Sequence, residues 1–178
     1  MTGMTSLLSK AQLVTKIYVP RWCIIIASTL NAAMIFGMNL FIIVLFCLVF
    51  QFMPSIASIA LFMAASICIY ILIVSFSLIT APLLIRFRDL QMIWEVLTSI
   101  LFYASPIIYP LTLLPANVRQ ILLINPIAFI IHFTKEALVN NHFIDPLQAI
   151  GFIIFLAITF LFSIFAYQKL EPRIAESM

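Results

Sequence analysis

Residues 86–138, RFRDLQMIWEVLTSILFYASPIIYPLTLLPANVRQILLINPIAFIIHFTKEAL, decide the fold of this chain. The stretch opens with three charges in four residues and then becomes apolar, with prolines that interrupt it. After Asn125-Pro126 the apolar segment is shorter than the roughly 20 residues that a helix needs to cross a membrane. We therefore expect residues 115–139 to enter the membrane and return to the same side, as a re-entrant helical hairpin. Irregular backbone at membrane depth is stable only where protein or water covers it, and it is typical of transporters and channels.

The composition of the whole chain indicates an all-α integral membrane protein. Of 178 residues, 65% are hydrophobic and 8% are charged, whereas roughly 25% of the residues in a soluble domain are charged. The net charge of +3 is small, which argues against nucleic acid binding. The sequence contains no arrangement of residues typical of a catalytic or metal site. We therefore expect neither an enzyme nor a bound cofactor or metal.

The uncharged run between Arg21 and Arg86 predicts the first two membrane spans. It contains 64 residues, and as one helix it would be about 96 Å long, twice the thickness of a bilayer with its headgroups. The run must therefore fold back once, and Pro54 marks the hinge because proline is favoured at the first position of a helix. Asp145 and Pro146 predict the cap and first residue of the last span. We expect one transmembrane domain over residues 1–178, with an amphipathic cytoplasmic segment at 1–21, four spans at 22–50, 54–85, 93–114 and 146–168, and the hairpin at 115–139.

Lysines and arginines predict the orientation, because the cytoplasmic loops of membrane proteins carry more of them. With a re-entrant hairpin, seven of the nine basic residues lie on one side of the membrane. These seven are Lys10, Lys16, Arg21, Arg86, Arg88, Lys169 and Arg173, whereas Arg119 and Lys135 lie on the other side. We therefore expect both termini to be cytoplasmic.

The charged residues Arg86, Arg88 and Asp89 form a compact elbow between two predicted spans. They can serve as a topology anchor, with the arginines at the level of the lipid phosphates and Asp89 capping the helix that begins at Leu90. They can also offer a rigid cytoplasmic contact to another protein. The residues alone leave both interpretations open.

Two prolines interrupt the end of the third predicted span. Pro106 lacks the N–H that would bond the carbonyl of Phe102, and Pro110 lacks the one for the carbonyl of Pro106. These carbonyls and the hydroxyls of Ser105 and Tyr109 predict a kinked and locally polar helix end. Such an end is either a tolerated kink or a gate at the outer mouth of a pathway.

The hairpin itself contains a helix start, because Asn125 is a favoured cap and Pro126 a favoured first residue. Aromatic side chains accompany this region, among them Phe102, Tyr103 and Phe129. Aromatic residues usually anchor membrane helices at the interface. Sugar rings also stack on aromatic faces, so the alternative is a translocation path for a carbohydrate.

Four motifs together carry a family resemblance. They are Lys16-Ile-Tyr-Val-Pro20-Arg21-Trp22, Arg86-Phe-Arg-Asp89-Leu90, Ser105-Pro-Ile-Ile-Tyr-Pro110 and Asn125-Pro-Ile-Ala-Phe129, in this order. The chain resembles the permease subunit of type-2 ABC exporters, in the branch that exports O-antigen, capsule or teichoic-acid chains. The resemblance covers nearly the whole chain from about Leu8 onward.

The resemblance implies a homodimeric permease in the bacterial cytoplasmic (inner) membrane that exports a lipid-linked polysaccharide. It also implies a separate ATP-binding subunit that hydrolyses ATP. The residues it assigns to ATPase coupling are Lys16, Arg21, Arg86, Arg88 and Asp89. It places Tyr109-Pro110 and Asn125-Pro126 at the turns of the family's outer gate, and together with the kinked helix end described above the expected gate residues are Ser105, Pro106, Tyr109, Pro110, Asn125 and Pro126.

Members of this family usually have two more spans before the region matched here, so we expect an N-terminally truncated chain. Two other functions stay open at this point. One is a membrane scaffold or truncated remnant that does not transport. The other is a type-2 ABC permease for drugs or lipids.

Overall fold

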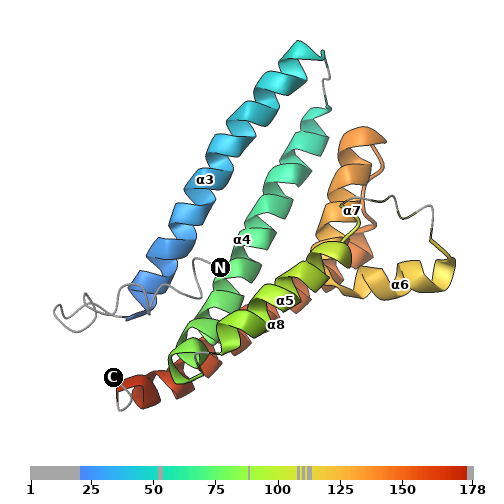
Figure 1. The fold of residues 1–178 in the computed structure, drawn as a ribbon. Coiled ribbons are helices and arrows are strands. Elements are labelled where there is room, and N and C mark those ends of the chain that lie inside the picture. The colour runs from blue at the N-terminus through green and yellow to red at the C-terminus, as the bar shows by residue number, and fades with distance from the viewer. Residues whose placement is uncertain are drawn as a thin grey trace. The chain divides into compact units, whose positions relative to one another are not determined.

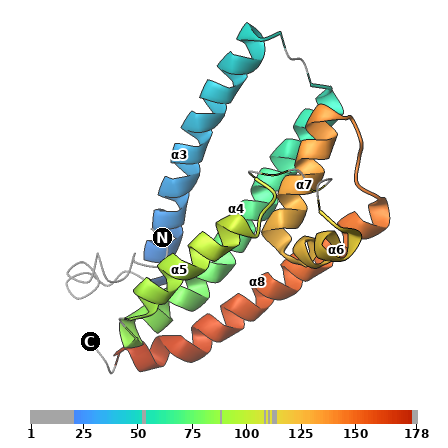
Figure 2. The ribbon, with the colours of Figure 1, turned by 45° about the vertical axis from the view of Figure 1, so that its right-hand side comes forward.

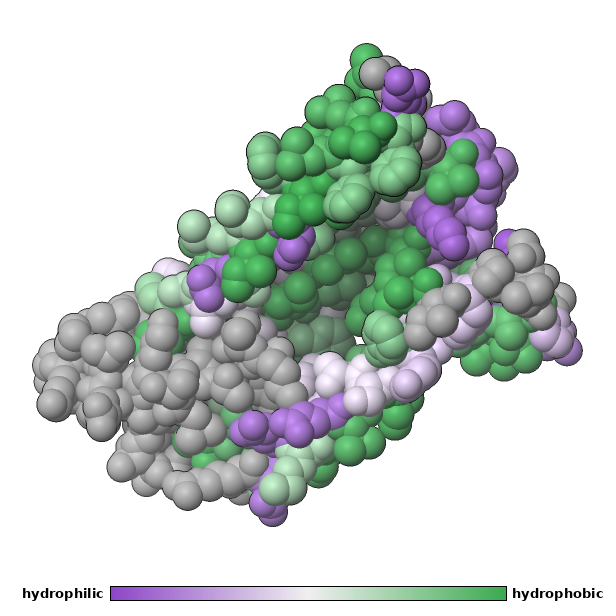
Figure 3. Space-filling view, turned by 45° about the horizontal axis from the view of Figure 1, so that its top comes forward, coloured by the Kyte–Doolittle hydropathy of each residue, from purple (hydrophilic) through white to green (hydrophobic). Residues whose placement is uncertain are grey.

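The computed structural model describes residues 21–51, 54–87, 89–107, 109, 111 and 114–175, which form helices joined by short turns and loops (Figure 1). The helices are α3 (Arg21–Val49), α4 (Ile56–Arg86), α5 (Leu90–Tyr103), α6 (Ala116–Ile124), α7 (Pro126–Val139) and α8 (Pro146–Ala175). Among the described residues, three segments are long and apolar enough to cross a membrane, namely Trp22–Val49, Ile56–Ile85 and Pro146–Leu170. Hydrophobic side chains cover much of the surface that these helices present (Figure 3). The chain is therefore an all-α integral membrane protein with several spans, as predicted.

The hinge between the first two long helices lies where the sequence predicts it, but α4 begins two residues later than expected. Ser55 caps α4, because its hydroxyl accepts a hydrogen bond from Ser58 N–H at 3.1 Å and its carbonyl accepts one from Ile59 N–H at 3.0 Å. A serine hydroxyl satisfies a free N–H at a helix start. The cap at Ser55 therefore decides where α4 begins, in place of Pro54 as its first residue.

The third predicted span, 93–114, contains a shorter helix than expected. Helix α5 has 14 residues and ends at Tyr103, directly before the turn that contains Ser105-Pro106. Helix α8 begins at Pro146 as predicted, and the carbonyl of Asp145 accepts the first helical hydrogen bond from Ala149 N–H at 3.0 Å. Proline thus stops one helix and starts the other.

The chain divides into two compact units, and α4 and α8 contribute to both of them. Unit 1 comprises Met1–Met53, Tyr70–Leu90 and Leu156–Met178, and unit 2 comprises Pro54–Ile69 and Gln91–Phe155. The division does not test the prediction of a single domain, which stays a prediction.

In unit 1, the first turns of α3 pack against the last turns of α4 and α8. The buried core contains Ile24, Ile25, Val74, Leu78, Ala81 and Tyr167. Ser28 is also buried here, and its hydroxyl donates to the carbonyl of Ile25 at 2.8 Å, so that no buried polar group is left over at this residue. The helix ends that carry Arg21, Arg86 and Lys169 therefore belong to one unit.

Candidate functional site

The candidate site lies in unit 2, where α6 and α7 meet at Asn125 with a bend of 109°. Asn125 ends α6 by donating its N–H to the carbonyl of Leu122 at 3.1 Å. It also begins α7, because its side-chain oxygen accepts a hydrogen bond from Ile127 N–H at 3.0 Å and Pro126 follows as the first residue. The predicted helix start is confirmed. Pro126 has no N–H and keeps the two helices from merging into one.

The bent pair is compatible with the predicted re-entrant hairpin in length. Helix α7 has 14 residues, which corresponds to about 21 Å, less than the roughly 30 Å of the hydrocarbon core. The side-chain nitrogen of Asn125 is buried and has no hydrogen-bond partner in the described part of the chain. A buried donor without a partner is uncommon in folded proteins, so the hydrogen bonding at this bend is unusual.

Helix α7 ends in a left-handed turn. The carbonyl of Glu136 accepts hydrogen bonds from Asn140 N–H at 2.9 Å and from His142 N–H at 3.3 Å. Between these two residues, Asn141 has a φ of 51°, a conformation that asparagine tolerates better than most residues. The side chain of Asn140 also donates to the Glu136 carboxylate at 2.7 Å. This end of α7 is therefore well defined.

A side chain from α4 completes the same helix end. The Ser58 hydroxyl donates to the carbonyl of Ala137 at 2.6 Å and lies 3.2 Å from the side-chain oxygen of Asn141. Ser58 and Ala137 are both 0% exposed. The contact joins residues 79 positions apart in the sequence and places the end of α7 beside the first turn of α4 (Figure 2).

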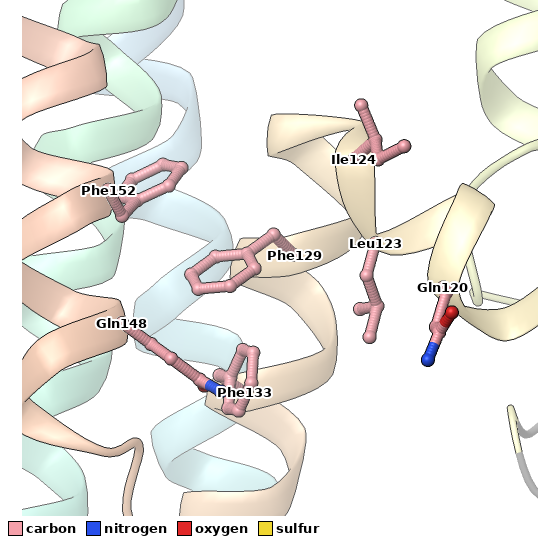
Figure 4. A pocket seen from close by; sticks show the side chains of 7 residues that line it. All are labelled: Gln120, Leu123, Ile124, Phe129, Phe133, Gln148 and Phe152. Carbon is pink, nitrogen blue, oxygen red and sulfur yellow. The ribbon is translucent and has the colours of Figure 1, made fainter.

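A groove of about 370 Å³ lies next to the bend, between α6, α7 and α8 (Figure 4). Its lining consists of Gln120, Leu123, Ile124, Phe129, Phe133, Gln148 and Phe152. The rings of Phe129 and Phe152 are stacked, with centroids 5.0 Å apart and planes at 11°. Phe129 also contacts Phe133, with ring centroids 4.5 Å apart. The groove therefore combines a rigid aromatic wall with two amide side chains.

Phe129 also lines a second, apolar pocket of about 230 Å³. This pocket includes small residues of α4, among them Ala64 and Ala65, and it shares Phe133 and Phe152 with the groove. The predicted path residue Phe129 thus lines two hollows of unit 2.

The predicted gate residues Ser105 and Tyr109 close the end of α5. The Ser105 hydroxyl donates to the carbonyl of Leu101 at 2.8 Å, and the Tyr109 hydroxyl donates to the carbonyl of Tyr103 at 2.8 Å. The prediction that Pro106 leaves the carbonyl of Phe102 without a donor is wrong. The last turn tightens, so that Ser105 N–H reaches this carbonyl at 3.3 Å.

The other predicted path residues lie elsewhere in unit 2. Phe102 and Tyr103 pack edge to face, with centroids 5.6 Å apart, and are 46% and 69% exposed. They belong to α5, whereas the groove with Phe129 is lined by α6, α7 and α8. Pro106 is buried beside Ser105, and Pro110 lies outside the described residues.

The predicted coupling residues that the structure describes belong to unit 1. Arg21 is the first residue of α3, Arg86 is the last of α4, and Asp89 is exposed in the turn before α5. Helix α5 begins at Leu90 as predicted. Lys16 and Arg88 lie outside the described residues. The coupling role of all five residues stays a prediction.

Four residues of the site were not predicted from the sequence, namely Ser58, Phe152, Gln120 and Gln148. Ser58 stands in an apolar run with no neighbouring motif, and its partner is a backbone carbonyl that any residue would supply. Phe152 is one of 17 phenylalanines, and only the packing of α8 against α7 distinguishes it. The spacing of residues in the sequence contains no signal for either contact.

Comparison with known proteins identifies the family. The family described as ABC-2 type transporter matches residues 5–143. Two proteins of Klebsiella pneumoniae, each named O-antigen export system permease protein RfbA, are 26% identical to this chain over 175 residues, which is 96% of the chain. The chain spans 66% of the length of these relatives. Because the family match covers more than half of the sequence, this multi-pass membrane protein belongs to the ABC-2 type transporter family.

Proposed function

We propose that the chain forms the transmembrane permease part of an ATP-driven exporter of lipid-linked polysaccharide in the bacterial cytoplasmic membrane. The observation that carries this proposal is the similarity, over 96% of the chain, to permeases named for O-antigen export. In this proposal the permease is a homodimer, and a separate ATP-binding subunit hydrolyses ATP. The chain itself supplies the path and the outer gate.

The groove in unit 2 supports a carbohydrate substrate. A sugar ring has an apolar face that stacks on an aromatic ring and hydroxyls at its edge that need hydrogen bonds. The rings of Phe129 and Phe152 offer an aromatic surface for the apolar face of the sugar. The amides of Gln120 and Gln148 offer both donors and acceptors for its hydroxyls. An apolar lining with few polar groups is typical of sites that bind organic ligands.

The contact between Ser58 and Ala137 supports the proposed topology. Because the start of α4 and the end of α7 are in contact, the proposed topology places both on the same side of the membrane. Because α4 then crosses, the chain must cross an odd number of times between residues 86 and 140. In the proposed topology the predicted span 93–114, which contains most of α5, crosses with the turn that follows this helix; α6 and α7 enter and return, and α8 crosses back. Both termini then lie on the basic side, which is the cytoplasmic side.

The gate in this proposal is the bent pair α6–α7 together with the closed end of α5. It contains Ser105, Pro106, Tyr109, Pro110, Asn125 and Pro126. In this proposal the start of α3 and the ends of α4 and α8 face the ATP-binding subunit, with Lys16, Arg21, Arg86, Arg88 and Asp89 in coupling roles. The exposure of Asp89 supports contact with a partner.

The lining of the groove favours one second candidate. Leu123, Ile124 and the three phenylalanines make it mostly apolar. An apolar drug or a lipid without a glycan would also fit this lining. The family is compatible with such a substrate, so the experiment must distinguish it.

The test replaces the matching region of the Klebsiella relative with this chain, in cells that lack the native permease. Antibodies against the O-antigen then measure how much polysaccharide reaches the surface. We expect export to be restored, and cells without any permease give the baseline. A chimera that inserts at the parental level but leaves the polysaccharide inside would overturn the proposed substrate class. Export of an apolar dye by such a chimera would favour the second candidate.

The same chimera tests coupling with a matched pair of variants. Asp89→Asn and Asp145→Asn each exchange a carboxylate for an amide of the same shape. Asp89 lies in the turn before α5, and Asp145 lies before α8 in unit 2. We expect Asp89→Asn alone to lower export while membrane insertion stays unchanged. Equal export by both variants would leave Asp89 no coupling role.

A further inference from the structure

We propose that Ser58 is a positioning residue, whose hydroxyl fastens the end of α7 to the start of α4 and thereby sets where the aromatic rings of α7 lie in the groove. The physical attachment stands on the geometry alone. Its consequence for export rests on the proposed function, because it assumes that α7 is part of the gate.

The carbonyl of Ala137 explains why a donor is needed at this place. The last four carbonyls of a helix have no donor from a following turn. At the end of α7, backbone N–H groups serve the carbonyl of Glu136, whereas the carbonyl of Ala137 receives the hydroxyl of Ser58. Both Ser58 and Ala137 are completely buried. Water therefore does not reach this carbonyl while the contact is intact.

The hydroxyl has one hydrogen, and the distances show where it goes. The Ala137 carbonyl, at 2.6 Å, is closer than the Asn141 side-chain oxygen at 3.2 Å. The Ser55 hydroxyl, 2.9 Å away, can donate to the oxygen of Ser58 in turn. The start of α4 thus presents a small hydrogen-bonded cluster to the end of α7.

The attachment extends along α7 because a helix is rigid over this length. Ile130, Thr134 and Ala137 follow at helical spacing and are all buried. Ile130 and Thr134 line the same pocket as Leu61 and Ala64 of α4. With α7 held on this face and at its end, Phe129 and Phe133 cannot slide along the groove. The other end of α7, at Asn125, keeps a buried amide donor without a partner among the described residues.

A disulfide tests the attachment independently of transport. Cysteines are placed at positions 58 and 141 of the full chain, after the native Cys23, Cys47 and Cys68 have been replaced by alanine. Mild oxidation in isolated membranes should link the pair, which a mobility shift after proteolysis between the two positions reports. A control pair uses position 66, two turns further along α4, with position 141. The attachment would be overturned if positions 58 and 141 did not form a disulfide, or if positions 66 and 141 formed one to the same extent.

Labelling of a buried position tests the role of the hydroxyl. Thr134→Cys provides a reporter of nearly the same size, and a membrane-impermeant maleimide measures how often it becomes accessible. Ser58→Ala should raise the labelling rate by about fivefold or more, because the Ala137 carbonyl loses its partner. Ser66→Ala is the control, since among the described residues the Ser66 hydroxyl donates within α4, to the carbonyl of Phe62 at 2.8 Å. Ser58→Thr should return the rate towards the parental value, and equal rates for both alanine variants would exclude the role.

Export in the chimera separates the inference from the proposed function. If the disulfide forms and labelling responds but no polysaccharide is exported by the parent, the attachment stands and the proposed function fails. If the parent exports polysaccharide and formation of the disulfide stops this export, Ser58 positions the gate as proposed. If the parent exports equally well with Ser58→Ala despite faster labelling, the attachment has no role in transport, and that part of the inference is overturned.

Discussion

The ends of α5 and α7 satisfy their last carbonyls in different ways. At the end of α5 the donors follow in sequence, from Ser105 and Tyr109 to carbonyls of the preceding turn. At the end of α7 one donor is Ser58, which lies 79 positions earlier in α4. The hydrogen bonds at the end of α5 form whenever this segment folds. The hydrogen bond from Ser58 to the end of α7 forms only when α4 and α7 pack together, so its contribution to stability measures tertiary packing.

The largest effect is expected where the donor is distant and the acceptor is buried. Ser58→Ala should destabilise the fold by about 1–3 kcal/mol, because it leaves the Ala137 carbonyl buried and unpaired. Equilibrium unfolding in mixed detergent micelles measures this change. Ser66→Ala removes a hydroxyl from the same helix without removing an interhelical bond, and it should change stability little. If both variants lost the same amount of stability, the bond from Ser58 to the end of α7 would contribute no more than a hydroxyl within α4, and the contrast with the end of α5 would be wrong.

A smaller effect is expected at the start of α7. Asn125→Ala removes the cap on Ile127 N–H and should cost about 1 kcal/mol. Asn125→Ser keeps an accepting oxygen at the cap and adds no charge at the buried position of the amide nitrogen, so it should preserve most of the stability. The two variants differ in the cap, and both lack the buried amide donor. Loss of export in Asn125→Ser at near-parental stability would assign a transport role to that donor.

Tyr109→Phe should have a weaker effect on the end of α5. The lost hydrogen bond to the Tyr103 carbonyl is worth about 0.5–1 kcal/mol, the net contribution of one hydrogen bond to a group that protein does not bury. The same unfolding measurement, with Tyr70→Phe as the control in unit 1, gives the value. A loss as large as that of Ser58→Ala would mean that the end of α5 also depends on tertiary packing.

Ser105→Ala should have the smallest effect, below about 0.5 kcal/mol. Although Ser105 is buried, its own backbone N–H lies in the same turn and can move from the Phe102 carbonyl to that of Leu101. Hydrogen exchange of the amides in α5 should stay at the parental rate. A clear loss of protection there would show that the hydroxyl, and not the backbone, closes the helix.

The same contrast explains how much of the molecule could be predicted from its sequence. The start of α7 at Asn125-Pro126 and that of α8 at Pro146 are local features, and both were predicted correctly. The start of α4 was placed two residues early because Ser55 is a stronger cap than Pro54 is a starting residue. The missing donor of the Phe102 carbonyl was predicted wrongly because a tighter last turn supplies one.

The candidate site itself was predictable only in part. Phe129 was singled out as a path residue, and it lines the groove. Its partner Phe152 and the attachment at Ser58 depend on how α8 and α4 pack against α7, which no residue spacing encodes. Sequence patterns thus located the bent helices and not the neighbours that hold them.

The distance of Ser58 from its partner along the chain has a consequence for biogenesis. At a synthesis rate of about 5–20 residues per second, the 79 residues that separate the two groups take about 4–16 s to emerge from the ribosome. Helix α4 is completed early in that interval, so the Ser58 hydroxyl must be satisfied by its own helix or by water before α7 emerges. The end of α7 can therefore dock against α4 only late in translation.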